Sequence, residues 1–194
     1  MTKLYFVRHA QPDYRTGEDS TFSLSAEGME DRMRAAEALR NIPLDICISS
    51  PYKRSIDTII PCAEEHSLKI LTDIRLRERD RITNKSNNYE MFKKRWADFS
   101  YHEEGGESLG ECQKRNIEAI GDILEKYDGK SILIGTHGTA LSTIINRDDA
   151  SFGLEAFMRI INYMPYVVRM DFEGKEYIGM EELAFVAKKF HGQR

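Results

Sequence analysis

The chain has 194 residues, of which 41% are hydrophobic and 31% are charged, and its net charge is −4. This balance is ordinary for a water-soluble globular protein, and the negative charge argues against a general nucleic-acid-binding or anionic-membrane-binding surface. The length suits one domain, which we expect to span residues 1–194, and no apolar run approaches the roughly 18 residues of a membrane-spanning helix.

Strands and helices alternate along most of the chain. Short apolar runs predict strands at residues 4–7, 44–48, 69–71 and 131–135. Apolar residues at helical spacing predict helices at residues 25–41, 52–66, 107–127 and 138–146, the first and third capped by Ser25 and Ser108. Such alternation is typical of an α/β three-layer sandwich, in which helices cover both faces of a mostly parallel central sheet.

In the C-terminal part of the chain, the alternation of strands and helices ends. Residues 166–178 predict a β-hairpin with a turn at Gly174, which adds antiparallel strands to one edge of the sheet. The apolar residues Leu183, Val186 and Phe190 predict a last short helix. The hairpin leaves an open sheet edge, so a homodimer is one alternative for the assembly.

Basic side chains and histidines follow three of the predicted strands, and Arg8 and His9 come directly after the first. Arg54 follows the turn after the second strand, and His137 follows the strand at 131–135. Because the carboxyl ends of parallel strands meet at one edge of a sheet, we expect these side chains to lie close together. Taken singly, each arginine also suits a surface salt bridge and each histidine a structural hydrogen bond.

Six segments, in this order, resemble the signature motifs of the histidine phosphatase superfamily, the phosphoglycerate-mutase-like enzymes. They are Arg8-His9-Ala10, Leu24–Gly28, Ser49–Thr58, Leu76-Arg77-Glu78, Gly106-Glu107-Ser108 and Thr136-His137-Gly138. The resemblance covers about residues 3 to 146. The sequence contains no HExxH motif, CxxC pair or Walker loop, so we expect neither a metal nor another cofactor.

The resemblance implies a role for each of these strand-end residues. His9 is expected to attack phosphorus and form a phosphohistidine, while Arg8 and Arg54 hold the phosphoryl oxygens with their forked guanidinium groups. His137 is expected to add a donor beside the start of a helix that Gly138 opens, where backbone N–H groups favour anions.

Glu78 is the residue that the resemblance implies as the proton donor to the leaving oxygen. A carboxyl group donates at neutral pH only where burial or nearby negative charge, such as a substrate phosphate, keeps it protonated. The neighbouring Arg77, Arg79 and Arg81 would oppose this if they pointed inward. A surface glutamate in an ion pair is therefore the alternative.

Two positions near the expected phosphate site depart from the family pattern. Ala10 replaces a glycine, which is harmless only if the backbone φ there is negative. Arg15 stands where many members have an asparagine, and we expect it to add a cation to the phosphate site.

Residues 79–105 are the stretch least like the family. Tyr89, Phe92, Trp96 and Phe99 recur at spacings of three and four and predict an amphipathic helix, with the basic run 93–95 beside the aromatic residues. Either this helix packs its aromatic face on the core and leaves a solvated basic rim, or the stretch is a cap insertion over the site that selects the substrate.

The cysteines and the N-terminus predict a cytoplasmic protein. Cys47, Cys62 and Cys112 are odd in number, widely separated and set among apolar or helical residues, as reduced thiols are. The apolar run before Arg8 has only four residues, 4–7, far fewer than a secretory signal needs. A nucleophilic cysteine is the alternative, but none follows a basic strand end.

These features predict a histidine acid phosphatase-type phosphomonoesterase that hydrolyses a small phosphorylated metabolite through a phosphohistidine. A phosphoglycerate mutase is one alternative, although Glu78 is followed by Arg79-Asp80-Arg81 and not by the Arg-His-Tyr-Gly run of the mutase branch. A catalytically silent phosphoester-binding module is the other, and the departures at Ala10 and Arg15 are its support.

Overall fold

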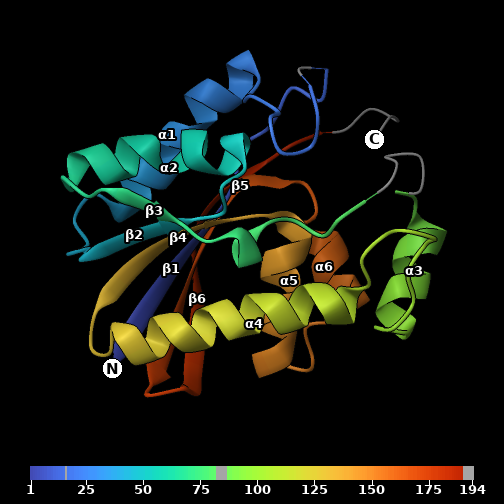
Figure 1. Cartoon of the computed structure of the whole chain (residues 1–194). Coiled ribbons are helices and arrows are strands. Elements are labelled where there is room, and N and C mark those ends of the chain that lie inside the picture. Colours follow the sequence, from blue (N-terminus) through green and yellow to red (C-terminus); the bar gives the residue numbers. More distant parts are fainter. Residues whose placement is uncertain (16, 82–86, 190–194) are drawn as a thin grey trace.

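The computed structural model describes residues 1–15, 17–81 and 87–189. Its centre is a six-stranded sheet with the strand order β3-β2-β4-β1-β5-β6 (Figure 1). The first four strands in this order are parallel, and β5 and β6 continue the sheet as an antiparallel hairpin. The strands are β1 (Thr2–Arg8), β2 (Ile46–Ser49), β3 (Ile70–Thr72), β4 (Ser131–Thr136), β5 (Tyr163–Glu173) and β6 (Glu176–Ala187).

Helices lie on both faces of this sheet, so the predicted three-layer α/β fold is confirmed. α1 and α2 cover one face, and α4, α5 and α6 cover the other (Figure 1). The helices are α1 (Ala26–Leu39), α2 (Lys53–Glu65), α3 (Tyr89–Ala97), α4 (Leu109–Lys126), α5 (Gly138–Asp148) and α6 (Leu154–Ile160), with a short 3-10 helix η1 (Ile74–Leu76). The N-terminal caps predicted at Ser25 and Ser108 are both formed.

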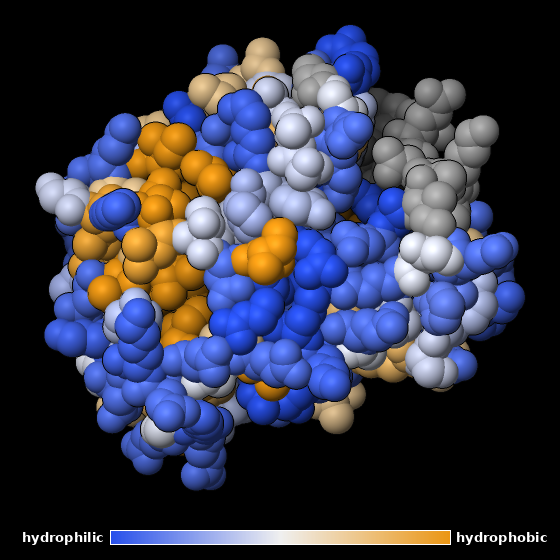
Figure 2. Space-filling view, in the orientation of Figure 1, coloured by the Kyte–Doolittle hydropathy of each residue, from blue (hydrophilic) through white to orange (hydrophobic). Residues whose placement is uncertain are grey.

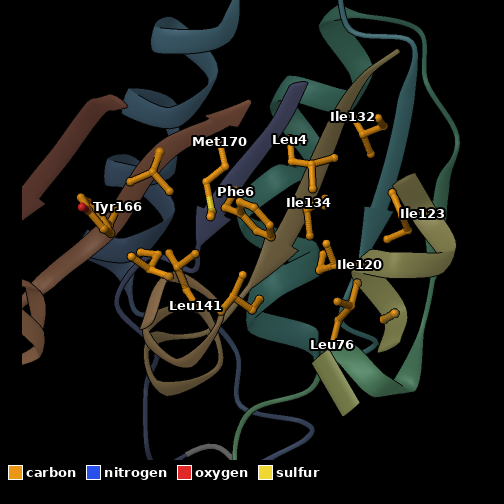
Figure 3. Close-up of a cluster of buried hydrophobic side chains, with 14 of the residues drawn as sticks. Leu4, Phe6, Leu76, Ile120, Ile123, Ile132, Ile134, Leu141, Tyr166 and Met170 are labelled. Carbon is orange, nitrogen blue, oxygen red and sulfur yellow. The ribbon is translucent and has the colours of Figure 1, made fainter. Parts of the chain in front are cut away.

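The central strand β1 is buried on both of its faces. Leu4 and Phe6 belong to the apolar cluster beneath α4, α5 and α6, part of which Figure 3 shows. Tyr5 and Val7 point the other way, into the cluster beneath α1 and α2. A strand covered twice must be apolar along its whole length, which explains the unbroken run at 4–7 and places the next residues at the sheet edge.

The chain after β1 is held against the start of α1 by a close backbone approach. The Ser25 N–H donates to the Gln11 carbonyl oxygen at 2.9 Å, and a β-carbon at position 28 would lie 2.2 Å from that same oxygen. Only glycine fits at Gly28, because any side chain would push this loop away from the helix. The segment that carries His9 is thereby fixed on its C-terminal side.

The C-terminal third differs from the sequence-based expectation in two places. The predicted last helix is wrong where the structure describes it, because Leu183 and Val186 lie in β6, which pairs with β5 over most of its length. Phe190, the third residue of that prediction, lies outside the described residues. α6 was not predicted, and it supplies Phe157 and Ile160 to the core.

Apolar side chains also gather on part of the surface. Figure 2 shows them over the sheet edge that β2 and β3 form in Figure 1, and Leu71 of β3 and Ile74 of η1 are among the exposed large apolar residues. β6 is the outermost strand at the opposite edge, and a homodimer through that edge stays a prediction. None of the helices in the described ranges has the length and apolar character needed to cross a bilayer.

Candidate active site

His9 and His137 lie side by side because their strands are neighbours. β1 and β4 pair in parallel with Arg8 opposite Thr136, so the residue after each strand reaches the same edge of the sheet. The His9 N–H donates to the Thr136 carbonyl oxygen at 3.1 Å, and the two imidazole rings meet edge to face with centroids 5.2 Å apart. Both side chains are buried.

The hydrogen bonds around His9 leave one ring nitrogen available for nucleophilic attack. Its Nδ1 is 2.8 Å from the Ala10 carbonyl oxygen, which can only accept, so Nδ1 carries the proton and Nε2 holds a lone pair. Burial, and then the charges of Arg54 and Arg8, lower the pKa of His9 well below its usual value. The imidazole is therefore neutral at physiological pH, as a nucleophile at nitrogen must be.

Ala10 fits this arrangement without backbone strain. Its N–H donates to Thr58 Oγ1 at 2.9 Å, and Ser67 is the only non-glycine residue with a positive φ in the described parts of the chain. The φ at position 10 is therefore negative, and alanine in place of the family's glycine costs nothing in backbone conformation.

A hydrogen bond to one ring nitrogen holds the His137 side chain. Its Nε2 lies 2.7 Å from Ser50 Oγ, and Ser50 Oγ also accepts from the Tyr52 N–H at 3.2 Å. Its Nδ1 is buried and has no hydrogen-bond partner among the residues that the structure describes. Burial, and then the charges of Arg54 and His9, lower the pKa of His137 well below its usual value.

Arg8 is held in place at the edge of the sheet from two sides. Its Nη1 donates to the carbonyl oxygens of Ile160 at 2.8 Å and Tyr163 at 3.0 Å. On the other side it lies against Gly138, where a β-carbon would be 2.9 Å from Arg8 Cζ. Gly138 therefore allows the guanidinium to lie against the first turn of α5.

Arg54 is buried in the first turn of α2 and held by Asp19. It donates to the Asp19 carbonyl oxygen, and its Nη2 is 3.3 Å from Asp19 Oδ1. Its Cζ lies 5.1 Å from the centroid of the Tyr52 ring, a cation–π contact. Arg81 shares the same carboxylate through a bond of 3.0 Å, so Asp19 holds two guanidinium groups.

Glu78 is buried at the N-terminus of α5. Its Oε1 accepts from the N–H groups of Arg79 at 2.9 Å and Ala140 at 3.1 Å, and its Oε2 accepts from the Thr139 N–H at 3.2 Å. The alternative of a surface glutamate is therefore wrong. These three donors fix the orientation of the carboxyl group inside the cavity.

Arg115 of α4 fixes the loop that carries Glu78, and sequence reasoning missed it. Its guanidinium donates to the carbonyl oxygens of Arg75 at 2.6 Å, Arg77 at 2.7 Å and Glu78 at 3.0 Å. The Glu107 carboxylate binds it with both oxygens, at 2.6 and 2.7 Å. Glu107 of the Gly106-Glu107-Ser108 motif thus helps to hold this loop by binding Arg115. A spacing of eight residues between a glutamate and an arginine does not predict such an ion pair.

A cavity of about 830 Å³ brings most of the predicted residues together. Its wall includes Arg8, His9, Arg54, Glu78 and Gly138, and His137 lies directly beside His9. Arg15 is the exception, because its side chain is 88% exposed and its guanidinium binds Asp13 at 2.9 Å. The expectation that Arg15 adds a cation to the phosphate site is not met.

The stretch between Glu78 and α4 supplies cavity residues that sequence reasoning did not place there. Arg79, Arg81 and Arg95 all line the cavity, as do Phe92 and Trp96 of α3. The two aromatic side chains also pack on the core cluster, so α3 combines a core face with a cavity wall. The basic rim was only partly right, because Lys93 and Lys94 are exposed whereas Arg95 is buried. Residues 82–86 of this stretch lie outside the described residues.

The three cysteines lie outside the cavity wall. Cys47, Cys62 and Cys112 are buried, free and absent from the cavity wall, and burial raises the pKa of each thiol to about 12. A nucleophilic cysteine would need a lowered pKa and access to substrate, so that alternative has no support. In the described ranges, no group of three or more His, Cys, Asp or Glu side chains is arranged to hold a metal ion.

The family model of the histidine phosphatase superfamily (branch 1) matches residues 4–178, and the chain therefore belongs to that superfamily. A probable phosphoglycerate mutase, GpmB of Salmonella typhi, is 27% identical over 159 residues, which cover 75% of this chain and 74% of that protein. The uncharacterized phosphatase PhoE of Bacillus subtilis is 26% identical over 149 residues, with coverages of 75% and 76%.

Solved structures agree on the fold. Bacillus stearothermophilus YhfR superposes with a TM-score of 0.74 at 22% identity, covering 92% of this chain and 95% of that one. The phosphoserine phosphatase of Entamoeba histolytica, solved with 3-phosphoglyceric acid, gives a TM-score of 0.75 at 18% identity, with coverages of 97% and 98%.

Proposed function

We propose that this protein is a phosphomonoester hydrolase that acts on a small phosphorylated metabolite through a phosphohistidine at His9. The observation that carries the proposal is the neutral His9 imidazole, whose Nε2 is left free by the bond from Nδ1 to the Ala10 carbonyl oxygen. It stands in a cavity whose wall also contains Arg8, Arg54 and Glu78. The name of the Bacillus subtilis relative, a phosphatase, agrees with this reaction.

In the first step, His9 Nε2 forms a bond to phosphorus as the phosphorus–oxygen bond of the ester breaks. Arg8 and Arg54 neutralise the charge on the phosphoryl oxygens. If His137 Nε2 accepts from the Ser50 hydroxyl, its Nδ1 carries a proton and is a third donor. The departing oxygen takes its proton from Glu78, whose carboxyl group lies in the same cavity wall.

In the second step, the Glu78 carboxylate takes a proton from water, and the water oxygen attacks phosphorus. The phosphorus–nitrogen bond breaks, and its electron pair returns to Nε2 of His9. Inorganic phosphate leaves, and Glu78 is again protonated. The bond from Nδ1 to the Ala10 carbonyl oxygen persists through both steps and stabilises the positive charge that the ring carries while phosphorylated.

A phosphoglycerate mutase is the second candidate, and one observation favours it. A mutase must bind a second anionic group of its substrate, and the cavity wall carries Arg79, Arg81 and Arg95 beyond the phosphate-binding arginines. The silent-module alternative has lost its support, because Ala10 is unstrained and Arg15 lies outside the cavity.

Rapid quenching with a ³²P-labelled ester tests the nucleophile. We expect a phosphoenzyme that is labile in acid and stable in base, as a phosphorus–nitrogen bond is. It should be absent in His9→Ala and present in His102→Ala, a control at an exposed histidine. An adduct that survives acid, or turnover retained in His9→Ala, would contradict the proposal.

Product analysis with 3-phosphoglycerate separates the two candidates. A hydrolase gives free phosphate and glycerate, or leaves this compound unchanged while it hydrolyses other esters, whereas a mutase gives 2-phosphoglycerate. Because His9, Arg8 and Arg54 supply the nucleophile and the cations, we expect EDTA to leave the rate unchanged. Activity lost in EDTA and restored by a divalent ion would show that a metal takes part.

A further inference from the structure

The cavity has two chemically different ends. At the sheet edge, Arg8, His9 and Arg54 form the phosphoryl end. In another part of the wall, α3 and α6 contribute the aromatic side chains Phe92, Trp96 and Phe157. At about 830 Å³ the cavity reaches the size that binds drug-like molecules, which leaves room for much more than a phosphate group.

The aromatic part of the wall is rigid. Phe92 meets Phe157 edge to face with ring centroids 5.2 Å apart, and Trp96 lies 5.4 Å from the same ring. Phe157 belongs to the core cluster, and Phe92 and Trp96 pack against it, so their positions are set by packing before any ligand arrives. A preformed aromatic surface of this kind binds a flat apolar group at little entropic cost.

Two buried arginines stand beside this wall and share one carboxylate. Arg79 and Arg95 are 3% and 2% exposed. Arg95 donates to Glu103 Oε1, and Arg79 Nη1 lies 3.6 Å from Glu103 Oε2. Arg95 Nη1 also donates to Asn87 Oδ1 at 3.3 Å. Burial, and then the charge of Arg95, lower the pKa of Arg79, as expected where two cations share one anion.

Positive charge exceeds negative charge around the whole cavity. Among the residues that the structure describes, its wall carries five arginines and one carboxyl group, that of Glu78. Asp19 and Glu103 add two carboxylates behind the arginines, and residues 82–86 contain no acidic side chain in the sequence. One bound phosphate dianion balances the phosphoryl end. Among the described groups, Arg79 and Arg95 share one carboxylate, that of Glu103, and this arrangement favours a second anionic group beside them.

We propose that the end of the cavity formed by Arg79, Arg95, Phe92 and Trp96 selects phosphomonoesters whose alcohol part carries both a carboxylate and an aromatic or similarly flat apolar group. This inference rests on the proposed function, because it assigns the substrate class of the same site. The carboxylate binds the two guanidinium groups, and the flat group packs on Phe92 and Trp96.

Four primary phosphate esters separate the two features. 4-Carboxybenzyl phosphate carries both the ring and the carboxylate, benzyl phosphate only the ring, 3-phosphoglycerate only the carboxylate, and glycerol 3-phosphate neither. We expect 4-carboxybenzyl phosphate to have the highest kcat/KM, on the order of tenfold or more above benzyl phosphate, as one charge-assisted bond to a guanidinium provides. A ratio near one in the wild-type protein would overturn the inference without any variant.

Variants on α3 test which side chains cause the preference for the carboxylate and for the aromatic ring. Arg95→Gln should reduce the ratio of kcat/KM between 4-carboxybenzyl and benzyl phosphate towards one. Lys94→Gln, an exposed neighbour on the same helix, should leave that ratio unchanged. Trp96→Leu should reduce the ratio between benzyl phosphate and glycerol 3-phosphate. An unchanged carboxylate ratio in Arg95→Gln would mean that Arg95 and Glu103 only tie α3 to the chain before α4.

Failure of this inference can be told apart from failure of the proposed function. If all four esters release phosphate at similar kcat/KM, the hydrolase stands and the subsite is refuted. If none releases phosphate and no phosphoenzyme forms, the hydrolase is refuted. Calorimetric titration of His9→Ala with 4-carboxybenzyl and benzyl phosphate then decides the subsite by affinity alone, with equal affinities counting against it.

Discussion

Replacing Gly138 with alanine tests whether the position of Arg8 controls the reaction. Gly138 is the first residue of α5, and its φ is not positive, so alanine meets no backbone strain there. The new β-carbon would lie 2.9 Å from Arg8 Cζ and 3.0 Å from Nε and Nη2. Carbon atoms in ordinary contact are about 3.5–4.0 Å apart, so the guanidinium must move by roughly 0.5–1 Å.

The expected cost falls on catalysis more than on folding. A displacement near 1 Å in a group that holds the substrate lowers the rate by about 100-fold, equivalent to roughly 2.7 kcal/mol of transition-state stabilisation. Overpacking destabilises a fold by about 1–3 kcal/mol, whereas alanine in place of a helical glycine recovers up to ~1 kcal/mol. We therefore expect the free energy of unfolding to fall by no more than ~3 kcal/mol.

The assay compares kcat/KM for 4-nitrophenyl phosphate with urea unfolding of the same samples. Gly121→Ala is the matched control, because it is also a helical glycine and its β-carbon would meet no atom within 4 Å. The control should be as active as the wild type and slightly more stable. Wild-type kcat/KM in Gly138→Ala would refute the reasoning, as would a loss fully explained by unfolding.

Three other predictions concern Arg115, His9 and Arg15. Arg115→Lys keeps the charge but loses the forked guanidinium that binds three carbonyl groups, so we expect the free energy of unfolding to fall by ~1–3 kcal/mol. We also expect kcat to fall, because the loop that carries Glu78 is less well held. An unchanged kcat in a destabilised variant would make Arg115 purely structural. Burial, Arg54 and Arg8 lower the pKa of His9, so its ¹⁵N signals should remain those of the neutral Nδ1–H tautomer down through pH 6. The unfolded chain takes up this proton near pH 6.5, so urea unfolding should show stability falling below that pH; an imidazolium signal at pH 6 would contradict both statements. Arg15→Ala should leave kcat/KM unchanged because the side chain is exposed, and a tenfold loss would place Arg15 at the phosphate.

The sheet and the edge that carries the candidate site were predictable because they follow from local rules. Apolar runs between helices predict parallel strands, and the ends of parallel strands meet, so Arg8, His9 and His137 had to converge. Ser25 and Ser108 were also predictable, since capping depends on residues only three positions away.

The features that sequence reasoning missed depend on contacts between distant segments. Which member of the run 93–95 turns inward depends on Glu103 and on the packing of α3 against α6. Arg15 sits in a loop, where Asp13 two residues away binds it instead of a phosphate. Leu183 has helical spacing to Val186, but the edge of β5 offers backbone partners that a helix there would leave unused.

The residues around the phosphate and those at the far end of the cavity come from different parts of the chain. The side chains proposed to bind phosphate follow β1, β2 and β4, whereas Arg79, Phe92, Arg95 and Trp96 all belong to the stretch between η1 and α4. Substitutions at Phe92, Arg95 and Trp96 would change the cavity wall without replacing a residue of the sheet edge. Under the proposed function, proteins that share this sheet edge can therefore differ in substrate through this one stretch while keeping the same phosphoryl-transfer residues.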